Sequence, residues 1–97
     1  CERGIRMFET STRNTLDITS VAIIKKETNL PIIIDISHSL GRKDIALPVT
    51  KAVIALGVDG IMAEVHNEPE KAVSDSSQQF SIEEFTFLFR EIKKILI

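Results

Sequence analysis

The strongest constraint on the fold is a short apolar run that ends abruptly in polar residues, PIIIDISHSLGRKD at residues 31–44. Three consecutive isoleucines before Asp35 are typical of a strand buried on both faces, as in a parallel sheet. A second run, GIMAEVH at residues 60–66, repeats the pattern about 28 residues later and also ends in polar side chains. The repeat favours serial βα units.

Helical patterns precede and separate these two runs. Residues 14–28 place apolar side chains among polar neighbours, and Asn14 or Thr15 is available as the N-cap. Residues 47–57 predict a second helix that ends at Gly57, a favourable residue at a helix C-terminus. Each predicted strand is therefore preceded by a predicted helix.

A third helical pattern begins after Ser81, and Glu84 three residues later predicts a capping box. The resulting order of helices and strands is that of a (β/α)8 barrel or an open doubly wound sheet. Two strands cannot bury both faces of such a sheet, and the chain begins with Cys1 rather than with methionine. We therefore expect residues 1–97 to be one partial domain, a fragment of a longer chain.

The composition excludes several classes of function. The chain has 12 basic and 14 acidic residues, interspersed, with a net charge of −2. It therefore has no basic stripe for nucleic acid and no polybasic patch for a membrane. Its apolar runs are much shorter than the roughly 20 residues that span a bilayer, and a single cysteine agrees with a reducing compartment. We expect a cytoplasmic protein that binds neither nucleic acid nor membranes.

The polar residues after the two predicted strands are candidates for a metal site. In either architecture the functional residues lie at the carboxyl ends of the strands. The first strand ends in Asp35, Ser37 and His38, and the second in Glu64 and His66. Imidazole nitrogen and carboxylate oxygen are the usual ligands of Mn, Fe, Co and Zn. The pattern predicts a divalent-metal site but is weakly specific, since the ligands come from separate loops.

Three motifs carry a resemblance to a known family: CERGIRMFETSTRNTLD, DISHSLGRKD and GIMAEVHNEPEKAVSDSSQQ. In order, and over essentially the whole chain, they resemble the carboxyl-terminal third of 3-deoxy-D-arabino-heptulosonate 7-phosphate (DAHP) synthases, of the branch related to 3-deoxy-D-manno-octulosonate 8-phosphate (KDO8P) synthase. The resemblance implies an α/β fold, a (β/α)8 TIM barrel to which this chain supplies the end of strand six, strands seven and eight and helices six to eight. It implies a metal-dependent, aldol-type condensation of phosphoenolpyruvate with erythrose 4-phosphate that releases phosphate, the first step of the shikimate pathway to aromatic amino acids.

The resemblance also implies the roles of individual residues. His38, Glu64 and Asp75 match the family's metal ligands, so His38 is the expected catalytic residue, and Arg3 matches the arginine that holds the phosphate of phosphoenolpyruvate. The implied cofactor is a divalent metal ion: Mn, Fe, Co or Zn. The family's fourth ligand is a cysteine near the end of an early strand, so by resemblance it is not Cys1.

Each of these residues also has a structural interpretation. His38 could hydrogen-bond within its own loop, Arg3 could be a solvated charge, and Asp75 is ordinary loop chemistry when taken alone. Cys1 is more typical of a small buried apolar residue than of a reactive thiol. Glu64 is harder to explain in this way, because a carboxylate among apolar neighbours is costly to desolvate unless it is paired or liganded.

Two other functions stay open. The sister enzyme, 3-deoxy-8-phosphooctulonate synthase, uses arabinose 5-phosphate and shares the ERG motif, whereas IRMFETSTRNTLD is more similar to the heptulosonate branch. Alternatively, the chain is an inactive truncated or structural fragment. We expect the isolated chain to be inactive and the full-length protein to be a homo-oligomer.

Overall fold

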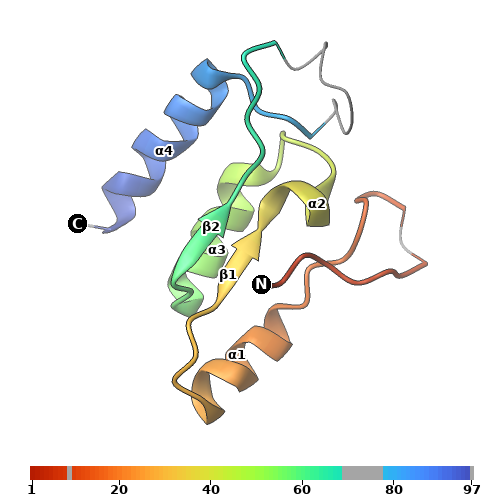
Figure 1. Ribbon diagram of the computed structural model, residues 1–97, viewed down its shortest axis with the longest axis vertical. Coiled ribbons are helices and arrows are strands. Elements are labelled where there is room, and N and C mark those ends of the chain that lie inside the picture. The colour runs from red at the N-terminus through yellow and green to blue at the C-terminus, as the bar shows by residue number, and fades with distance from the viewer. Residues whose placement is uncertain (9, 69–77, 97) are drawn as a thin grey trace.

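Two parallel strands form the centre of the computed structural model, which describes residues 1–8, 10–68 and 78–96 (Figure 1). Strand β1 (Ile33–Asp35) pairs with β2 (Gly60–Met62), with Ile34 opposite Ile61. The helices are α1 (Ile18–Glu27), α2 (Ile36–Leu40), α3 (Ala46–Leu56) and α4 (Ile82–Leu96). The predicted α/β class with parallel strands is therefore confirmed.

The N-terminal residues add a third parallel segment beside β1. The Glu2 N–H donates to the Ile33 carbonyl at 2.8 Å, and the Asp35 N–H donates to the Glu2 carbonyl at 2.8 Å. Glu2 thereby forms a parallel bridge to Ile34. This segment directs Arg3 toward the same end of the sheet at which β1 and β2 terminate.

Helix α2 corrects the expectation that a loop follows β1. It begins directly after Asp35, whose Oδ1 accepts hydrogen bonds from the N–H groups of Ser37 at 2.9 Å and His38 at 2.8 Å. It ends at Gly41, which has the left-handed φ of 67° that helix C-termini favour. Five residues are too few to show helical periodicity, so the sequence pattern did not reveal this helix.

Two other boundaries differ from expectation. Helix α1 begins at Ile18 rather than near residue 14, because Asp17 is its N-cap and accepts a hydrogen bond from the Ser20 N–H at 3.0 Å. Thr15 instead forms an antiparallel bridge to Ile5. Strand β2 is also shorter than predicted, so Glu64 lies just beyond the strand rather than within it.

The predicted caps of the last two helices are confirmed. Ser81 Oγ accepts from the Glu84 N–H at 3.0 Å, and Glu84 Oε1 accepts from the Ser81 N–H at 2.8 Å, which is the reciprocal capping box at the start of α4. Gly57 follows α3 with φ of 94°. Within the described ranges, no helix is long and apolar enough to cross a membrane.

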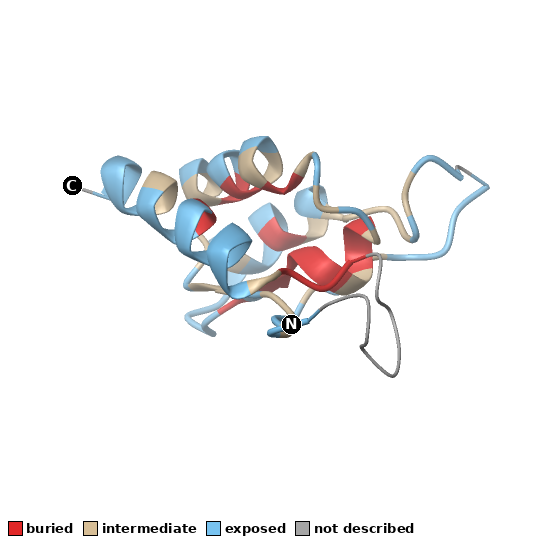
Figure 2. Ribbon diagram, turned by 90° about the horizontal axis from the view of Figure 1, so that it is seen from above, coloured by how far each residue is buried: buried red, intermediate tan, exposed pale blue. Residues whose placement is uncertain are grey.

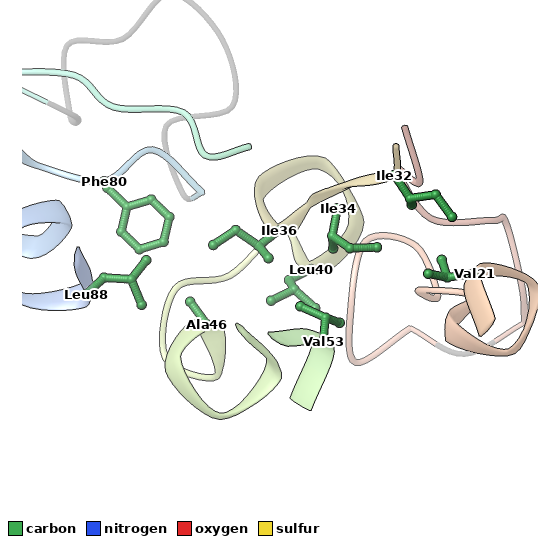
Figure 3. Packing of buried hydrophobic residues seen from close by; sticks show 9 residues of the cluster. All are labelled: Val21, Ile32, Ile34, Ile36, Leu40, Ala46, Val53, Phe80 and Leu88. Carbon is green, nitrogen blue, oxygen red and sulfur yellow. The ribbon is translucent and has the colours of Figure 1, made fainter. Parts of the chain in front are cut away.

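The apolar core runs from α1 through the sheet to α4. Figure 3 shows Val21 and Ile32 at one end of the cluster and Phe80 and Leu88 at the other. Its nine buried members are Val21, Ile32, Ile34, Ile36, Leu40, Ala46, Val53, Phe80 and Leu88. Seen from above, burial concentrates in β1 and α2, whereas most of α4 is exposed (Figure 2). The segment that carries His38 is therefore among the best packed.

The loop before α1 packs across α2 and supplies partners for its last carbonyl groups. The N–H groups of Arg13 and Asn14 donate to the carbonyls of Leu40 at 3.0 Å and Ser39 at 2.7 Å. Gly4 permits this contact, since a Cβ built on it would lie 2.6 Å from the Cβ of Asn14. The glycine of the ERG motif thus has a packing role in addition to any role near a ligand.

We expect the 97-residue chain, when expressed alone, to be marginally stable or to self-associate. Its outer sheet edges and much of α4 are open, and an apolar hollow of about 280 Å³ beside β2 is lined in part by Phe85 and Phe89. Exposed apolar surface and unpaired strand edges favour association. Thermal unfolding and sedimentation at several concentrations test this, and a sharp, concentration-independent transition of a monomer would contradict it.

Candidate functional site

The ends of β1 and β2 bring His38 and Glu64 into contact. His38 lies in α2, directly after β1, and Glu64 lies two residues beyond β2. The His38 Nε2 and Glu64 Oε1 atoms are 2.5 Å apart, and the side chains are 24% and 23% exposed. Two of the three predicted metal ligands therefore converge at a site that solvent can reach. Their role as ligands stays a prediction.

The buried carboxylate of Asp35 holds the other side of the His38 ring. Its Oδ2 lies 2.6 Å from His38 Nδ1, and the Asp35 side chain is fully buried. Burial raises the pKa of Asp35, but the hydrogen bonds from the His38 backbone and ring, the charge of His38 and the Ser37 N–H outweigh it, so the pKa is lowered. A carboxylate acceptor at Nδ1 favours the tautomer with its proton on that nitrogen.

The contacts of the two ring nitrogens of His38 indicate what the site can bind. Two atoms 2.5 Å apart have room only for a proton between them, so the contact is a hydrogen bond, and a metal ion, whose bonds to nitrogen and oxygen are about 2.0–2.2 Å long, would replace that proton and move Nε2 and Oε1 further apart. A metal-binding histidine commonly donates its other ring N–H to a carboxylate in this way. The donor set and the position of Asp35 therefore fit a divalent metal.

Glu64 is held by three further groups, of which the sequence analysis named only Ser37, as a polar residue at the end of the first strand. Its N–H donates to Ser37 Oγ at 2.8 Å, which links the two strand ends. Gln78 Nε2 donates to Glu64 Oε1 at 3.2 Å, and Gln79 Nε2 donates to Glu64 Oε2. Both glutamines are buried. The only signal in the sequence is a pair of amides beside Phe80, which is too common a pattern to predict such contacts.

Arg3 lies on the same rim. Its Nε is 3.4 Å from Asp35 Oδ2, the oxygen that also contacts His38, and its side chain is 59% exposed. A guanidinium in this position offers a charged, planar set of donors to an anionic ligand next to His38 and Glu64. Its predicted contact with a substrate phosphate is compatible with this position and stays a prediction.

The other candidates from the sequence, Asp75, Cys1 and His66, are not seen in contact with His38 or Glu64 in the described residues. Asp75 lies outside the described residues. In the described parts of the chain, no group of three or more His, Cys, Asp or Glu side chains that could hold a metal is found. Cys1 is exposed, so the expectation that it is buried is wrong. His66 makes a local contact, because its Nδ1 accepts from the Glu68 N–H at 2.9 Å, in keeping with its interpretation as a loop residue.

Comparison with known proteins identifies one family and two kinds of relative. The model of the DAHP synthetase I family matches residues 1–96. A phospho-2-dehydro-3-deoxyheptonate aldolase of Thermotoga maritima is 57% identical over 95 residues, which cover 98% of this chain and 28% of the relative. A 2-dehydro-3-deoxyphosphooctonate aldolase of Francisella philomiragia is 29% identical over 110 residues, which cover 99% of this chain and 39% of the relative.

The solved structures agree with the sequence matches. A crystal structure of the phospho-2-dehydro-3-deoxyheptonate aldolase (DAHP synthase) of Thermotoga maritima superimposes with a TM-score of 0.92 over 98% of this chain and 28% of that one. A truncated form of the Thermotoga maritima 3-deoxy-D-arabino-heptulosonate 7-phosphate synthase gives the same TM-score and is covered to 36%. The chain thus spans between 28% and 39% of the length of these relatives.

Proposed function

Because the chain belongs to the DAHP synthetase I family, we propose that it forms the carboxyl-terminal part of a DAHP synthase, a cytoplasmic enzyme that is homo-oligomeric when full-length. The full-length protein would condense phosphoenolpyruvate with erythrose 4-phosphate and release phosphate. One observation carries the proposal: His38 and Glu64 meet at 2.5 Å at the ends of two parallel strands, with Asp35 behind the ring.

We infer that the rest of the protein completes a (β/α)8 barrel. On this proposal the segment at Glu2 is the end of strand six, β1 and β2 are strands seven and eight, and α1, α3 and α4 are helices six to eight. The parallel register and the exposed apolar side chains of α4 support it. The closure of the barrel would cover the sheet edges that this chain leaves open.

His38 Nε2 and Glu64 Oε1 are the atoms that would hold a divalent metal, with Asp75 as the predicted third ligand. One imidazole and two carboxylates nearly neutralise a dication and suit Mn, Fe, Co or Zn. Such an ion supplies Lewis acidity, which polarises an aldehyde oxygen. Asp35 keeps the ring of His38 in one tautomer and one orientation, so the site is organised before the ion binds.

Arg3 would bind and orient phosphoenolpyruvate. In the condensation, the enol carbon attacks the aldehyde carbon, water adds to the carbon that bears the phosphate, and inorganic phosphate leaves. A guanidinium on the phosphate fixes the enol next to the aldehyde and remains near the negative charge of the leaving phosphate. The contact of Arg3 with Asp35 directs the guanidinium along the rim toward His38.

The choice of aldose phosphate can be tested directly by measuring phosphate release from phosphoenolpyruvate. Identity of 57% to the heptulosonate enzyme against 29% to an octulosonate enzyme favours erythrose 4-phosphate. We expect the full-length protein to show a kcat/KM for erythrose 4-phosphate about a hundred-fold above that for arabinose 5-phosphate, the scale on which a fitted site rejects an extra group. The reverse preference would establish the octulosonate reaction, and no release with either sugar would establish an inactive protein.

A further inference from the structure

The two carboxylate oxygens of Glu64 have different partners. Oε1 faces His38 Nε2 and accepts a hydrogen bond from Gln78 Nε2 at 3.2 Å, whereas Oε2 accepts a hydrogen bond from the side chain of Gln79. We propose that Gln79 is a positioning residue, which holds Oε2 so that Glu64 presents only Oε1 to the metal. The inference rests on the proposed function, since it assigns a role in the same metal site.

The backbone next to Gln79 is hydrogen-bonded to the backbone of Glu64, the residue whose side chain Gln79 contacts. The next residue, Phe80, donates its N–H to the Glu64 carbonyl at 2.9 Å and accepts from the His66 N–H at 2.8 Å. Phe80 is buried in the apolar core, and the Gln79 side chain is itself buried. The carboxamide therefore has a fixed position relative to the Glu64 backbone, and its N–H donor holds the carboxylate in one rotation.

Gln78 gives a second hold on the same carboxylate. Its Oε1 accepts from Arg13 Nη1 at 2.8 Å, and its Nε2 donates to Glu64 Oε1 at 3.2 Å. Because a guanidinium can only donate, the amide oxygen of Gln78 must face Arg13 and its NH2 group must face Glu64. The neighbouring Asn14 donates its side-chain N–H to the His38 carbonyl at 3.1 Å, so residues 13 and 14 contact the His38 segment directly and Glu64 through Gln78.

A fixed carboxylate matters because a free one can rotate. With both oxygens available, Glu64 could bind a metal through either oxygen or through both, and each mode changes the charge and the open positions at the ion. The donor on Oε2 competes with binding through that oxygen or through both, whereas the 3.2 Å contact of Gln78 leaves Oε1 a second lone pair that faces His38 and is open to the ion. Partners of this kind orient metal ligands, and losing them typically costs about 10- to 100-fold in metal affinity or activity.

The test replaces Gln79 in the full-length protein by Glu, a change of the NH2 donor to an oxygen acceptor at nearly constant shape. We expect Gln79→Glu to weaken metal binding about 10- to 100-fold, measured by chelator competition, and to shift the visible absorption of the Co²⁺-loaded protein. The KM for phosphoenolpyruvate should change less than about twofold, because Arg3 contacts Asp35 rather than Gln79. Gln79→Met, which removes the donor without adding charge, should produce a smaller shift in the same direction.

Gln78→Glu is the comparison variant: it also replaces a donor to Glu64 by an acceptor, but its carboxylate stays paired with the Arg13 guanidinium and the lost contact is the longer one, so its effect should be several-fold smaller. Thermal unfolding checks that each variant is folded. Metal affinity and Co²⁺ absorption that stay unchanged in both folded Gln79 variants would overturn the inference while leaving the proposed function intact. A folded wild-type protein that binds no metal would overturn the proposed function and the inference together.

Discussion

The full-length protein with His38→Ala is expected to lose its bound metal and to condense phosphoenolpyruvate with erythrose 4-phosphate on the order of a thousand-fold more slowly. The reason is that Lewis acid assistance at a carbonyl contributes several kcal/mol, and each 1.4 kcal/mol is about tenfold in rate. The substitution removes Nε2, which lies 2.5 Å from Glu64 Oε1, and leaves the buried Asp35 without its ring partner.

Metal content by elemental analysis and phosphate release at saturating substrate measure these two effects. His66→Ala is the matched control, because His66 also follows β2 but its ring accepts a hydrogen bond from the Glu68 N–H instead of facing Glu64, and its backbone N–H bond to Phe80 survives the substitution. This variant should retain its metal and most of its activity. Retention of metal by His38→Ala, or an equal loss in His66→Ala, would mean that the site has been assigned to the wrong histidine.

Arg3→Ala is expected to weaken phosphoenolpyruvate binding by on the order of 2 to 4 kcal/mol, the range for losing one partner of a hydrogen-bonded charge pair. Arg3 is placed for this role because its Nε lies 3.4 Å from Asp35 Oδ2 while most of the side chain is accessible. The metal content should not change, since Asp35 keeps its hydrogen bonds to the Ser37 and His38 N–H groups and to the His38 ring when Arg3 is removed.

Arg6→Ala is the control for charge alone. Arg6 lies three residues further along the same loop and is exposed, and we expect this variant to lose well under half as much binding energy as Arg3→Ala. Titration of phosphoenolpyruvate into the metal-loaded proteins, followed by calorimetry, gives both numbers. If binding of phosphoenolpyruvate barely changed in Arg3→Ala while metal was lost, Arg3 would support the metal site instead of the substrate.

The strands and the last two helices could be predicted because their signals are local. The run from Ile32 to Ile34 predicted a strand buried on both faces; the strand is present and Ile34 is buried, but Ile33 is 40% exposed, so the expectation of two covered faces is wrong for this chain. The reciprocal bonds between Ser81 and Glu84 need only adjacent turns of chain. The start of α1 was predicted too early, because it depends on a pairing between residues distant in the sequence. Asn14 is an acceptable cap by type, but the pairing of residues 5 and 15 keeps that segment extended, and Asp17 then caps the helix.

The candidate site could be predicted only in part. His38 and Glu64 follow from the rule that parallel strands end at one edge, and the family resemblance singles them out. The supporting residues Asp35, Gln78 and Gln79 depend on side-chain directions that no spacing in the sequence encodes. Helix α2 was not predicted either. The sequence therefore could not show that the Asp35 carboxylate both caps this helix and contacts the His38 ring.

The most direct test of the account is anomalous diffraction from crystals of the metal-loaded full-length protein, recorded at the absorption edge of the bound ion. The account predicts one strong peak about 2.0–2.2 Å from both His38 Nε2 and Glu64 Oε1, with Asp75 as a further ligand. Asp35 should remain on His38 Nδ1. A peak elsewhere, with His38 and Glu64 still in direct contact with each other, would contradict the central claim that these strand ends form the metal site.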